Sequence, residues 1–310
     1  MSNILIIKHG SLGDLIQAQG AIKDIKNSYV DSKVLLLTSV VYTNFMSRCP
    51  YIDGVLSDKR KPRWNILYLL RLKRLLLKYN FTHVFDLQNS SRTRFYRKFL
   101  LGKSIWSSTE TTLKKGEKKE NFDKGPVLER LKVQLNKSKI KTKYINNLDL
   151  SWSFVNIERL LKQYTNNEYV LIFPFCSKKH KNKKWPYFFQ LINKVKEHYK
   201  NKYPVLIAPG PGEIELAKKF NGKIVMNNNS AININQLITL IQKSKFIITN
   251  DTGPAHISSH LNKNGIALFG SHKSPEQVSI GNSNFNILKA KKISDLSLDV
   301  VFKEVMKHLN

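Results

Sequence analysis

The fold is decided by one stretch, Phe246-Ile247-Ile248-Thr249-Asn250-Asp251-Thr252-Gly253-Pro254-Ala255-His256. Its apolar start predicts a strand, and the polar turn behind it leads into a segment typical of a helix. Such a turn directs backbone N–H groups and the positive end of a helix dipole at one point, which favours an anion such as a phosphate. Asp251 or Thr252 suits the N-cap, and Gly253 and Pro254 suit the first turn. Taken by itself, the stretch is equally that of a capped helix.

The same alternation of strand and helix runs through the rest of the chain. In the first half, we predict strands at 3–7, 33–38 and 83–87 and helices at 14–27, 42–48, 64–79 and 152–164. The charged run 114–120 is expected to be a loop. In the second half, we predict strands at 169–173, 204–208, 223–226, 246–249 and 266–269 and helices at 186–199, 213–220, 235–244, 255–261 and 295–309.

This repeat predicts an α/β chain with two doubly wound domains, each built on a parallel sheet. Ligands of such sheets bind beyond the carboxyl ends of the strands, so two facing domains are expected to enclose one cleft. The predicted boundaries are 1–164 for the first domain and 165–294 for the second. A C-terminal helix at 295–310 is expected to pack back across the join.

The composition is strongly basic, with 52 Lys and Arg against 22 Asp and Glu and a formal net charge of +30. This excess indicates an anionic partner. The sequence has no zinc-finger spacing, aromatic RNA-binding strand or helix-turn-helix pattern, so nucleic acid is not expected. An anionic membrane or lipid-linked acceptor is favoured instead.

No stretch approaches the roughly 20 apolar residues of a membrane span, and the apolar run at the N-terminus is too short for a signal peptide. We therefore expect a soluble, cytoplasmic protein. Cys49 and Cys176 lie far apart, without metal-ligand spacing, and are expected to be free thiols.

A second turn, Lys8-His9-Gly10-Ser11-Leu12-Gly13-Asp14, follows the first predicted strand. Its two glycines resemble part of a dinucleotide fingerprint. The third glycine and the acidic ribose residue are missing, which disfavours a dehydrogenase. The carboxylate of Asp14 is ionised at neutral pH and stands at the start of a helix. It suits either a general base or a helix cap.

Two further strand-end turns carry polar groups. Five lysines lie within 178–184, between a strand and a helix that begins at a proline, and this loop suits a phosphate or an exposed charge run. In Ala208-Pro209-Gly210-Pro211-Gly212-Glu213, the carboxylate of Glu213 can accept hydrogen bonds from a sugar hydroxyl pair or cap its helix.

Together these four turns resemble glycosyltransferase family 9, the ADP-heptose:lipopolysaccharide heptosyltransferases. The resemblance spans nearly the whole chain, from Gly10-Ser11-Leu12-Gly13-Asp14 to Asp251-Thr252-Gly253-Pro254-Ala255-His256, and Ala267-Leu268-Phe269-Gly270 follows at the family's spacing. It implies the GT-B architecture of two facing Rossmann-like domains with parallel sheets. The first domain would bind the acceptor and the second the nucleotide sugar.

The resemblance also assigns residues. Asp14 and Lys183 are the implied catalytic residues, Asp14 as the base and Lys183 as the contact to the donor's phosphate and sugar. Glu213 matches the acidic residue on the nucleotide ribose. The implied donor site comprises Ser177, Lys183, Glu213, Asp251, Thr252, Gly253, Pro254 and His256, and the acceptor turn comprises Gly10, Ser11 and Gly13.

Two positions depart from the family pattern. Gly20 stands where members often carry proline, and this change is expected to alter only the start of a helix. Phe175 stands where a glycine commonly follows the proline, which leaves the shape of the phosphate cradle around Cys176 and Ser177 open.

The predicted function is inverting transfer of heptose from ADP-heptose onto an anionic inner-core lipopolysaccharide or related glycan. Because no Asp-x-Asp pair is visible, we expect neither a metal nor another cofactor, and Lys183 and the helix start at Thr252 and Gly253 would stabilise the leaving pyrophosphate. The expected partners are a nucleotide-sugar donor and a lipid-linked acceptor, and a monomer is expected. The alternatives are a nucleotide-sugar epimerase or phosphorylase, and a non-catalytic nucleic-acid-binding protein.

Peripheral contact with the cytoplasmic face of the inner membrane is a side hypothesis. The predicted helix 64–79 carries Arg71, Arg74 and Lys78 on one face and leucines on most of the remainder. An ordinary surface helix whose leucines enter the core is the favoured interpretation.

Overall fold

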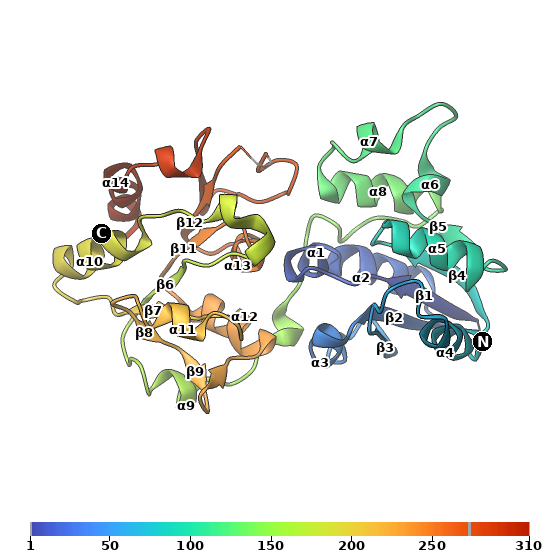
Figure 1. Cartoon of the computed structure of the whole chain (residues 1–310), viewed down its shortest axis with the longest axis horizontal. Helices are drawn as coiled ribbons and strands as arrows, with labels where there is room; N and C mark the ends of the chain where they lie inside the picture. The colour runs from blue at the N-terminus through green and yellow to red at the C-terminus, as the bar shows by residue number, and fades with distance from the viewer. Residues whose placement is uncertain (1, 272–273, 310) are drawn as a thin grey trace. The chain divides into compact units, whose positions relative to one another are not determined.

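A computed structural model describes residues 2–271 and 274–309 of the chain. It divides into two compact units, Met1–Trp152 and Ser153–Asn310. Each unit is a parallel sheet flanked by helices, as the alternation of strands and helices predicts (Figure 1). Within the described residues, no helix combines the length and apolarity that a membrane span requires.

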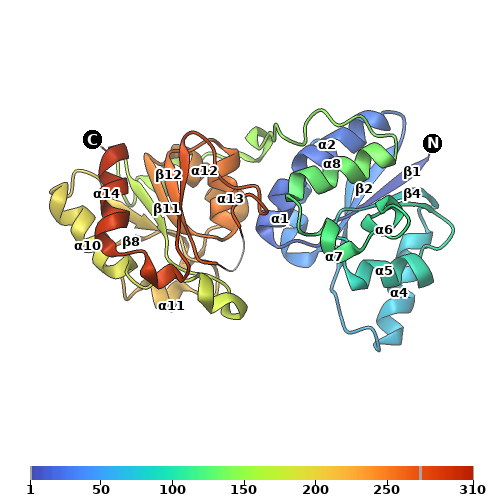
Figure 2. The same cartoon turned by 90° about the horizontal axis from the view of Figure 1, so that it is seen from above.

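The sheet of the first unit has the order β3-β2-β1-β4-β5, and all its strands are parallel. Its strands are β1 (Asn3–Ile7), β2 (Lys33–Ser39), β3 (Gly54–Asp58), β4 (Phe81–Asp86) and β5 (Ile105–Ser107). Its helices are α1 (Leu12–Gln17), α2 (Gln19–Ser28), α3 (Thr43–Met46), α4 (Ile66–Leu77), α5 (Ser91–Phe99), α6 (Thr109–Thr112), α7 (Lys119–Phe122) and α8 (Val127–Lys137). Figure 2 shows α2 and α8 on one side of this sheet and α4 and α5 on the other.

The sheet of the second unit has the order β13-β12-β11-β6-β7-β8 and is also parallel. Its strands are β6 (Val170–Phe173), β7 (Val205–Ile207), β8 (Lys223–Ile224), β11 (Phe246–Asn250), β12 (Gly265–Phe269) and β13 (Phe285–Lys289), and β9 (Met226–Asn227) pairs with β10 (Ser230–Ala231) in a separate hairpin. Its helices are α9 (Glu158–Leu161), α10 (Phe188–His198), α11 (Ile214–Ala217), α12 (Ile234–Lys243), α13 (Gly253–His260) and α14 (Leu298–Leu309).

The central strands are buried on both faces, which explains why they read as continuous apolar runs. Ile4 to Ile7 of β1 and Phe246 to Ile248 of β11 have no exposed surface. Helices α10 and α14 cover one face of the second sheet, because their apolar residues share a core with strands β6, β7 and β11. Burial of both sheet faces therefore fixes the strands whose ends carry the predicted site.

The division between the units falls 12 residues before the predicted boundary, after residue 152 rather than 164. The predicted helix 152–164 is wrong, because only Glu158–Leu161 is α-helical there. The segment that precedes α9 packs on α12 of the second unit. There the Asn235 amide donates to the Ser153 carbonyl at 2.8 Å, and the Val155 N–H donates to the Thr239 hydroxyl at 3.0 Å.

The C-terminal helix α14 begins at Leu298, three residues later than predicted, and follows a 3-10 helix at Ile293–Asp295. Helix α14 belongs to the second unit, where it packs against α10. Val301, Phe302 and Val305 are buried in the core of that unit. The apolar stripe of the helix therefore has a partner next to the strands β6 and β7.

Gly20 lies near the start of a helix, but its effect is not limited to the helix start as predicted. It lies inside α2, where an added Cβ would stand 2.1 Å from the carbonyl oxygen of Tyr144. The residue therefore allows the segment around Tyr144 to pack directly on the helix. The helix predicted at 14–27 is two helices, α1 and α2, separated at Ala18.

Candidate active site

Each sheet has one point at which the strand order reverses, and doubly wound folds bind ligands in the crevice at such a point. In the first sheet this point lies between β1 and β4, and in the second between β6 and β11. The turn Gly10–Asp14 follows β1, and the turn 251–256 follows β11. The two turns that carry the sequence prediction therefore both stand at switch points.

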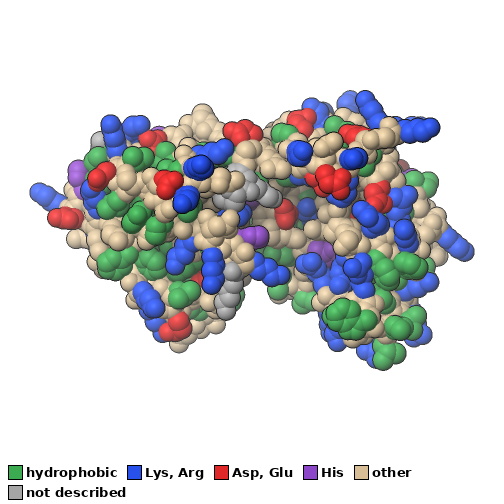
Figure 3. Space-filling view, turned by 45° about the horizontal axis from the view of Figure 1, so that its top comes forward, with side chains coloured by type: hydrophobic (Ala, Val, Ile, Leu, Met, Phe, Trp, Pro, Cys, Tyr) green, Lys and Arg blue, Asp and Glu red, His purple; other side chains and the backbone are tan. Residues whose placement is uncertain are grey.

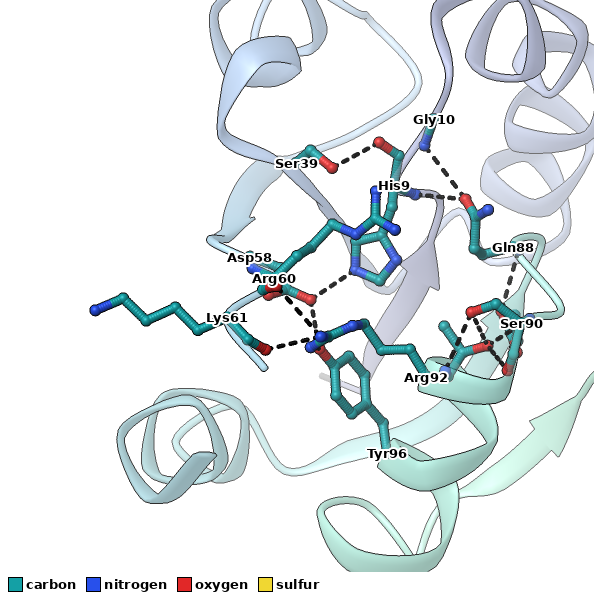
Figure 4. Close-up of polar contacts among 12 residues, drawn as sticks. His9, Gly10, Ser39, Asp58, Arg60, Lys61, Gln88, Ser90, Arg92 and Tyr96 are labelled. Atoms are coloured by element: carbon teal, nitrogen blue, oxygen red, sulfur yellow. Dashed lines mark hydrogen bonds and ion pairs between the residues drawn. The ribbon is translucent and has the colours of Figure 1, made fainter. Parts of the chain in front are cut away.

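The first turn requires glycine at its start. Gly10 has φ of +95°, and an added Cβ would lie 2.4 Å from the Tyr42 ring. The N–H groups of His9 and Gly10 both donate to Oε1 of Gln88, at 2.9 and 3.2 Å (Figure 4). Because Gln88 follows β4, the two strands at the switch point are tied together where the turn begins.

Asp14 is the third residue of α1 and forms a capping box with Ser11. Its Oδ2 accepts the Ser11 N–H at 2.9 Å and the Ser11 hydroxyl at 3.0 Å. The capping interpretation of Asp14 is therefore confirmed, and it is compatible with a role as base. The half-buried carboxylate also lines a cavity of about 130 Å³, together with Lys8, Arg130 and Gln134.

Lys8 is a cation of this cavity that sequence reasoning did not assign. It is 6% exposed, and its Nζ donates to the Leu87 carbonyl at 2.9 Å. Burial lowers its pKa, against the raising influence of the Asp14 and Asp86 carboxylates. The sequence could have indicated this residue, because Lys8 is a charged residue directly after the apolar strand β1.

A buried network of hydrogen bonds holds His9, the residue that precedes Gly10 in the first turn (Figure 4). Nε2 of His9 lies 2.8 Å from Oδ2 of Asp58, and the hydroxyls of Tyr68 and Tyr96 also donate to the Asp58 carboxylate. The Ser39 hydroxyl donates to the His9 carbonyl at 2.8 Å. Because His9 immediately precedes Gly10, this network fixes the backbone from which the Asp14 turn starts.

Asp58 is ionised within this network. Burial opposes its ionisation, but the hydrogen bonds from His9, Tyr68 and Tyr96 outweigh burial and lower the pKa of the carboxyl. The same carboxylate, together with burial, raises the pKa values of Tyr68 and Tyr96. Sequence reasoning missed Asp58 because it did not predict β3, the short strand that this residue ends.

In the second unit, the loop after β6 meets the turn after β11. Nζ of Lys183 lies 2.5 Å from Oδ2 of Asp251 and also donates to the Asp251 carbonyl at 3.3 Å. The Asp251 side chain is 2% exposed, whereas that of Lys183 is 18% exposed. The structure thus brings two predicted donor-site residues together and leaves part of the cation at the surface.

The predicted lysine-rich loop is a 3-10 helix, Lys178–Lys183, and the side chain of Lys178 lies outside the described residues. Its end is anchored by Trp185, which is fully buried. The Trp185 N–H donates to Oδ1 of Asn250 at 3.0 Å, and its indole N–H donates to the Leu296 carbonyl at 2.8 Å. Lys183 is therefore held beside the turn by a residue two positions away in the core.

Thr252 occupies the N-cap of α13 with an extended backbone. Its hydroxyl lies 3.4 Å from the Asn250 carbonyl and makes no side-chain cap, and Pro254 follows in the first turn as predicted. Gly253 begins the helix, which runs to His260. The positive end of the helix dipole therefore lies at Gly253, two residues beyond the Lys183 partner Asp251.

The remaining predicted donor residues contact other groups. Glu213 folds back onto its own turn, where its Oε2 accepts the Gly210 N–H at 2.8 Å, and burial raises its pKa. The Ser177 carbonyl accepts the His180 N–H at 2.9 Å, and its side chain is exposed. His256 is buried on α13. These three residues lie on separate segments of the second unit.

Phe175 does not fill the turn in which a glycine was expected. Its side chain is buried in the core of the second unit, with its ring centroid 5.7 Å from that of Phe220. The Phe175 carbonyl accepts from the Asn250 amide at 3.4 Å. The substitution therefore leaves the backbone next to Cys176 and Ser177 attached to the switch point.

No group of three or more His, Cys, Asp or Glu residues that could hold a metal ion occurs among residues 2–271 and 274–309. The groups that the structure assembles at the two switch points are instead an aspartate beside a buried lysine, and a lysine beside a buried aspartate. This arrangement offers a carboxylate that lines a cavity in the first unit and a cation with a helix N-terminus in the second.

Comparison with known proteins places these features in a family. The family model for glycosyltransferase family 9 (heptosyltransferase) matches residues 69–297. A lipopolysaccharide heptosyltransferase 1 from Campylobacter coli is 25% identical over 329 residues, which cover 94% of this chain and 91% of that protein.

Solved structures show the same fold. The glycosyltransferase family 9 protein from Veillonella parvula has a TM-score of 0.75 at 16% identity and covers 99% of this chain and 97% of its own. The E. coli heptosyltransferase WaaC with ADP has a TM-score of 0.71 at 15% identity, with 99% of each chain covered. Because the family model covers well over half of the residues, the chain belongs to glycosyltransferase family 9 and is a glycosyltransferase.

Proposed function

We propose that this enzyme transfers heptose from ADP-heptose to an anionic, lipid-linked acceptor of the lipopolysaccharide inner core, with inversion and without a metal. The observation that carries the proposal is the pair of switch-point sites, with Asp14 in one unit and the Lys183–Asp251 ion pair in the other. The relatives described above support the donor, since one is a lipopolysaccharide heptosyltransferase and another was solved with ADP.

The second unit supplies the donor site in this proposal. Lys183 has three N–H donors, and Asp251 engages the ammonium while 18% of the side chain stays exposed. A diphosphate can meet the remaining N–H and the dipole of α13 at Gly253. Asp251 then acts by holding Lys183 in place, and Glu213 accepts hydrogen bonds from the ribose. Ser177, Thr252, Pro254 and His256 complete the proposed lining.

The first unit supplies the acceptor site and the base. Lys8 and Arg130 line the cavity beside Asp14, and both are cations suited to an acceptor that carries carboxylates or phosphates. Gly10, Ser11 and Gly13 shape the turn that presents Asp14. We expect the lipid part of the acceptor to keep the enzyme in peripheral contact with the membrane.

In the chemical step, the acceptor hydroxyl gives its proton to Asp14 as its oxygen bonds to the anomeric carbon. The bond from that carbon to the phosphate oxygen breaks, and its electron pair leaves with ADP. A single displacement inverts the anomeric configuration. Negative charge grows on the leaving diphosphate, where Lys183 and the N-terminus of α13 stabilise it.

A donor screen tests the proposal. Nucleotide release is measured from ADP-heptose and from competing ADP-, GDP- and UDP-sugars, with and without an inner-core acceptor and with EDTA present. We expect acceptor-dependent release of ADP from ADP-heptose that EDTA leaves unchanged, and an inverted product by NMR. Preference for another nucleotide sugar would overturn the assigned donor, and turnover without an acceptor would indicate an epimerase or a hydrolase.

A further inference from the structure

Most leucines of helix α4 are not buried in the core, unlike those of an ordinary surface helix. Only Leu72 and Leu76 are buried, although the helix contains eight aliphatic residues besides its cations. One set of apolar side chains in this helix and just before it is exposed to solvent. This docking face consists of Trp64 (83% exposed), Ile66 (67%), Leu67 (70%), Leu70 (57%) and Leu77 (50%).

The exposed positions share one side of the helix. Ile66, Leu70 and Leu77 are spaced by four and seven residues, so their side chains project from the same face, and Trp64 precedes the N-cap Asn65. Single exposed leucines are common on protein surfaces and do not indicate a binding site. A contiguous exposed apolar face on one helix does indicate a binding surface. The favoured sequence interpretation, that these leucines enter the core, is therefore wrong for this face.

The charged residues in the sequence segment around the docking face are all cationic. Between residues 59 and 80 the chain carries eight Lys and Arg and no Asp or Glu. Arg71 and Arg74 lie on the exposed side of α4 among the apolar residues, and Lys59, Lys61 and Arg63 precede the helix and are exposed. Figure 3 shows green and blue side chains gathered at the lower right, over the part of the first unit that contains α4.

A cavity of about 350 Å³ opens beside the same helix. It is lined by the cations Lys59, Lys61 and Arg71 and by the apolar side chains of Leu67, Leu72 and Leu75. Cations and leucines around one space suit an amphiphile with an anionic headgroup and an acyl chain. The cavity thus combines cationic and apolar side chains, the same two kinds of side chain that lie on and around the docking face.

We propose that the docking face binds an anionic phospholipid membrane, with α4 lying in the plane of the interface. Apolar side chains would enter the acyl boundary, Trp64 would sit at the headgroup level, and the arginines would reach the lipid phosphates. A second copy of the chain is a poor occupant, because a two-fold pairing of this face would bring its cations against one another. The proposed lipid-linked acceptor explains why the enzyme would bind a membrane, and in this respect the inference rests on the proposed function. The physical argument for membrane binding does not depend on the acceptor.

The test uses the full chain and vesicles that contain no glycan. Co-sedimentation is measured with phosphatidylglycerol/phosphatidylethanolamine vesicles and with phosphatidylcholine vesicles. We expect binding to the anionic vesicles and a blue shift of tryptophan emission, since Trp64 is far more exposed than the buried Trp106 and Trp185. Trp64→Phe is expected to abolish most of the shift and to keep most of the binding.

Charge and apolar contact are then separated by matched variants. Arg71→Glu/Arg74→Glu is expected to weaken vesicle binding by at least about 30-fold, because each cation near an anionic surface contributes roughly fivefold. Lys291→Glu/Lys303→Glu makes the same change in net charge at exposed positions of the second unit and is expected to keep most of the affinity. Leu67→Ser/Leu70→Ser is expected to reduce binding and the blue shift, unlike Leu216→Ser/Val300→Ser at other exposed apolar positions.

Equal vesicle binding by the α4 charge variant and its matched control would overturn the proposal. Concentration-dependent dimerisation that Leu67→Ser/Leu70→Ser abolishes, without vesicle binding by the wild type, would assign the face to a second copy and also overturn it. Turnover with a lipid-free acceptor is measured alongside and is expected to be unchanged in every α4 variant. Failure of that turnover in the wild type would count against the proposed function alone, because the vesicle result does not depend on it.

Discussion

Asp14 in the first unit and Asp251 in the second both follow a buried parallel strand at a switch point, yet their surroundings differ. Asp14 is half-buried, caps α1 through Ser11 and lines a cavity. Asp251 is almost wholly buried and forms an ion pair with Lys183 at 2.5 Å. The same residue type thus has two uses. In the proposed function, the first carboxylate accepts the proton of the acceptor hydroxyl, and the second holds the cation that faces the donor phosphate.

The largest effect is expected from the accessible carboxylate. Asp14→Asn keeps an oxygen that can accept the Ser11 N–H but removes the base, so kcat should fall by roughly 10²–10⁴. Ser11→Ala is the matched control, because it weakens the capping box and leaves the carboxylate. Steady-state turnover of both variants separates the two roles. Similar losses in the two variants would mean that Asp14 acts only as a cap.

The next effect is expected from the cation of the other turn. Lys183→Met removes the charge that faces the donor diphosphate and should lower kcat/KM for the donor by about 10²-fold. Lys184→Met, at an exposed neighbouring position, is the control and should stay within about threefold. Because Lys183→Met also leaves Asp251 buried without its ion pair, thermal unfolding is measured in parallel. A donor effect no larger than that of Lys184→Met would remove Lys183 from the site.

The buried hydrogen-bond network around Asp58 predicts a pH-dependent contribution to stability. The pKa of Asp58 is lowered in the folded state, so its ionisation stabilises the fold above about pH 4 and this contribution is lost as the pH falls towards the folded pKa. Asp58→Asn should reduce the free energy of unfolding at pH 7 by about 3 kcal/mol, because it breaks a buried charged network. Urea unfolding from pH 7 to pH 3 should show a flatter pH dependence in the variant. Equal pH dependence in both proteins would contradict the assigned network.

The smallest effect is expected at the ribose end of the donor site. Glu213→Gln retains an acceptor oxygen, so donor KM should rise by only about 3- to 10-fold. Burial raises the pKa of Glu213, so wild-type donor affinity should weaken on acidification at a higher pH than for an ordinary glutamate. The variant should lack this pH dependence. A wild-type donor KM that is constant between pH 7 and pH 5 would argue against contact with the ribose.

The strands that frame both turns could be predicted because parallel strands buried on both faces are continuous apolar runs, as in Ile4 to Ile7 and Phe246 to Ile248. The family resemblance placed Lys183 and Asp251 in one implied donor site, but their direct contact could not be predicted, because 68 residues separate them. Asp58 could not be predicted, because its strand is short and its partners, His9, Tyr68 and Tyr96, come from three other segments. Membrane contact by α4 could be raised from the sequence only as a side hypothesis, because a leucine-rich pattern does not say which leucines are buried in a core.

The most direct test of this division of roles is calorimetric titration of ADP into the wild type, Asp14→Asn and Lys183→Met. We predict that Asp14→Asn binds ADP within about twofold of the wild type while Lys183→Met loses at least about tenfold in affinity. This result would place the nucleotide at the second turn and leave the first turn for the acceptor. If Asp14→Asn lost as much affinity for ADP as Lys183→Met, the nucleotide would depend on both turns and the account would be contradicted.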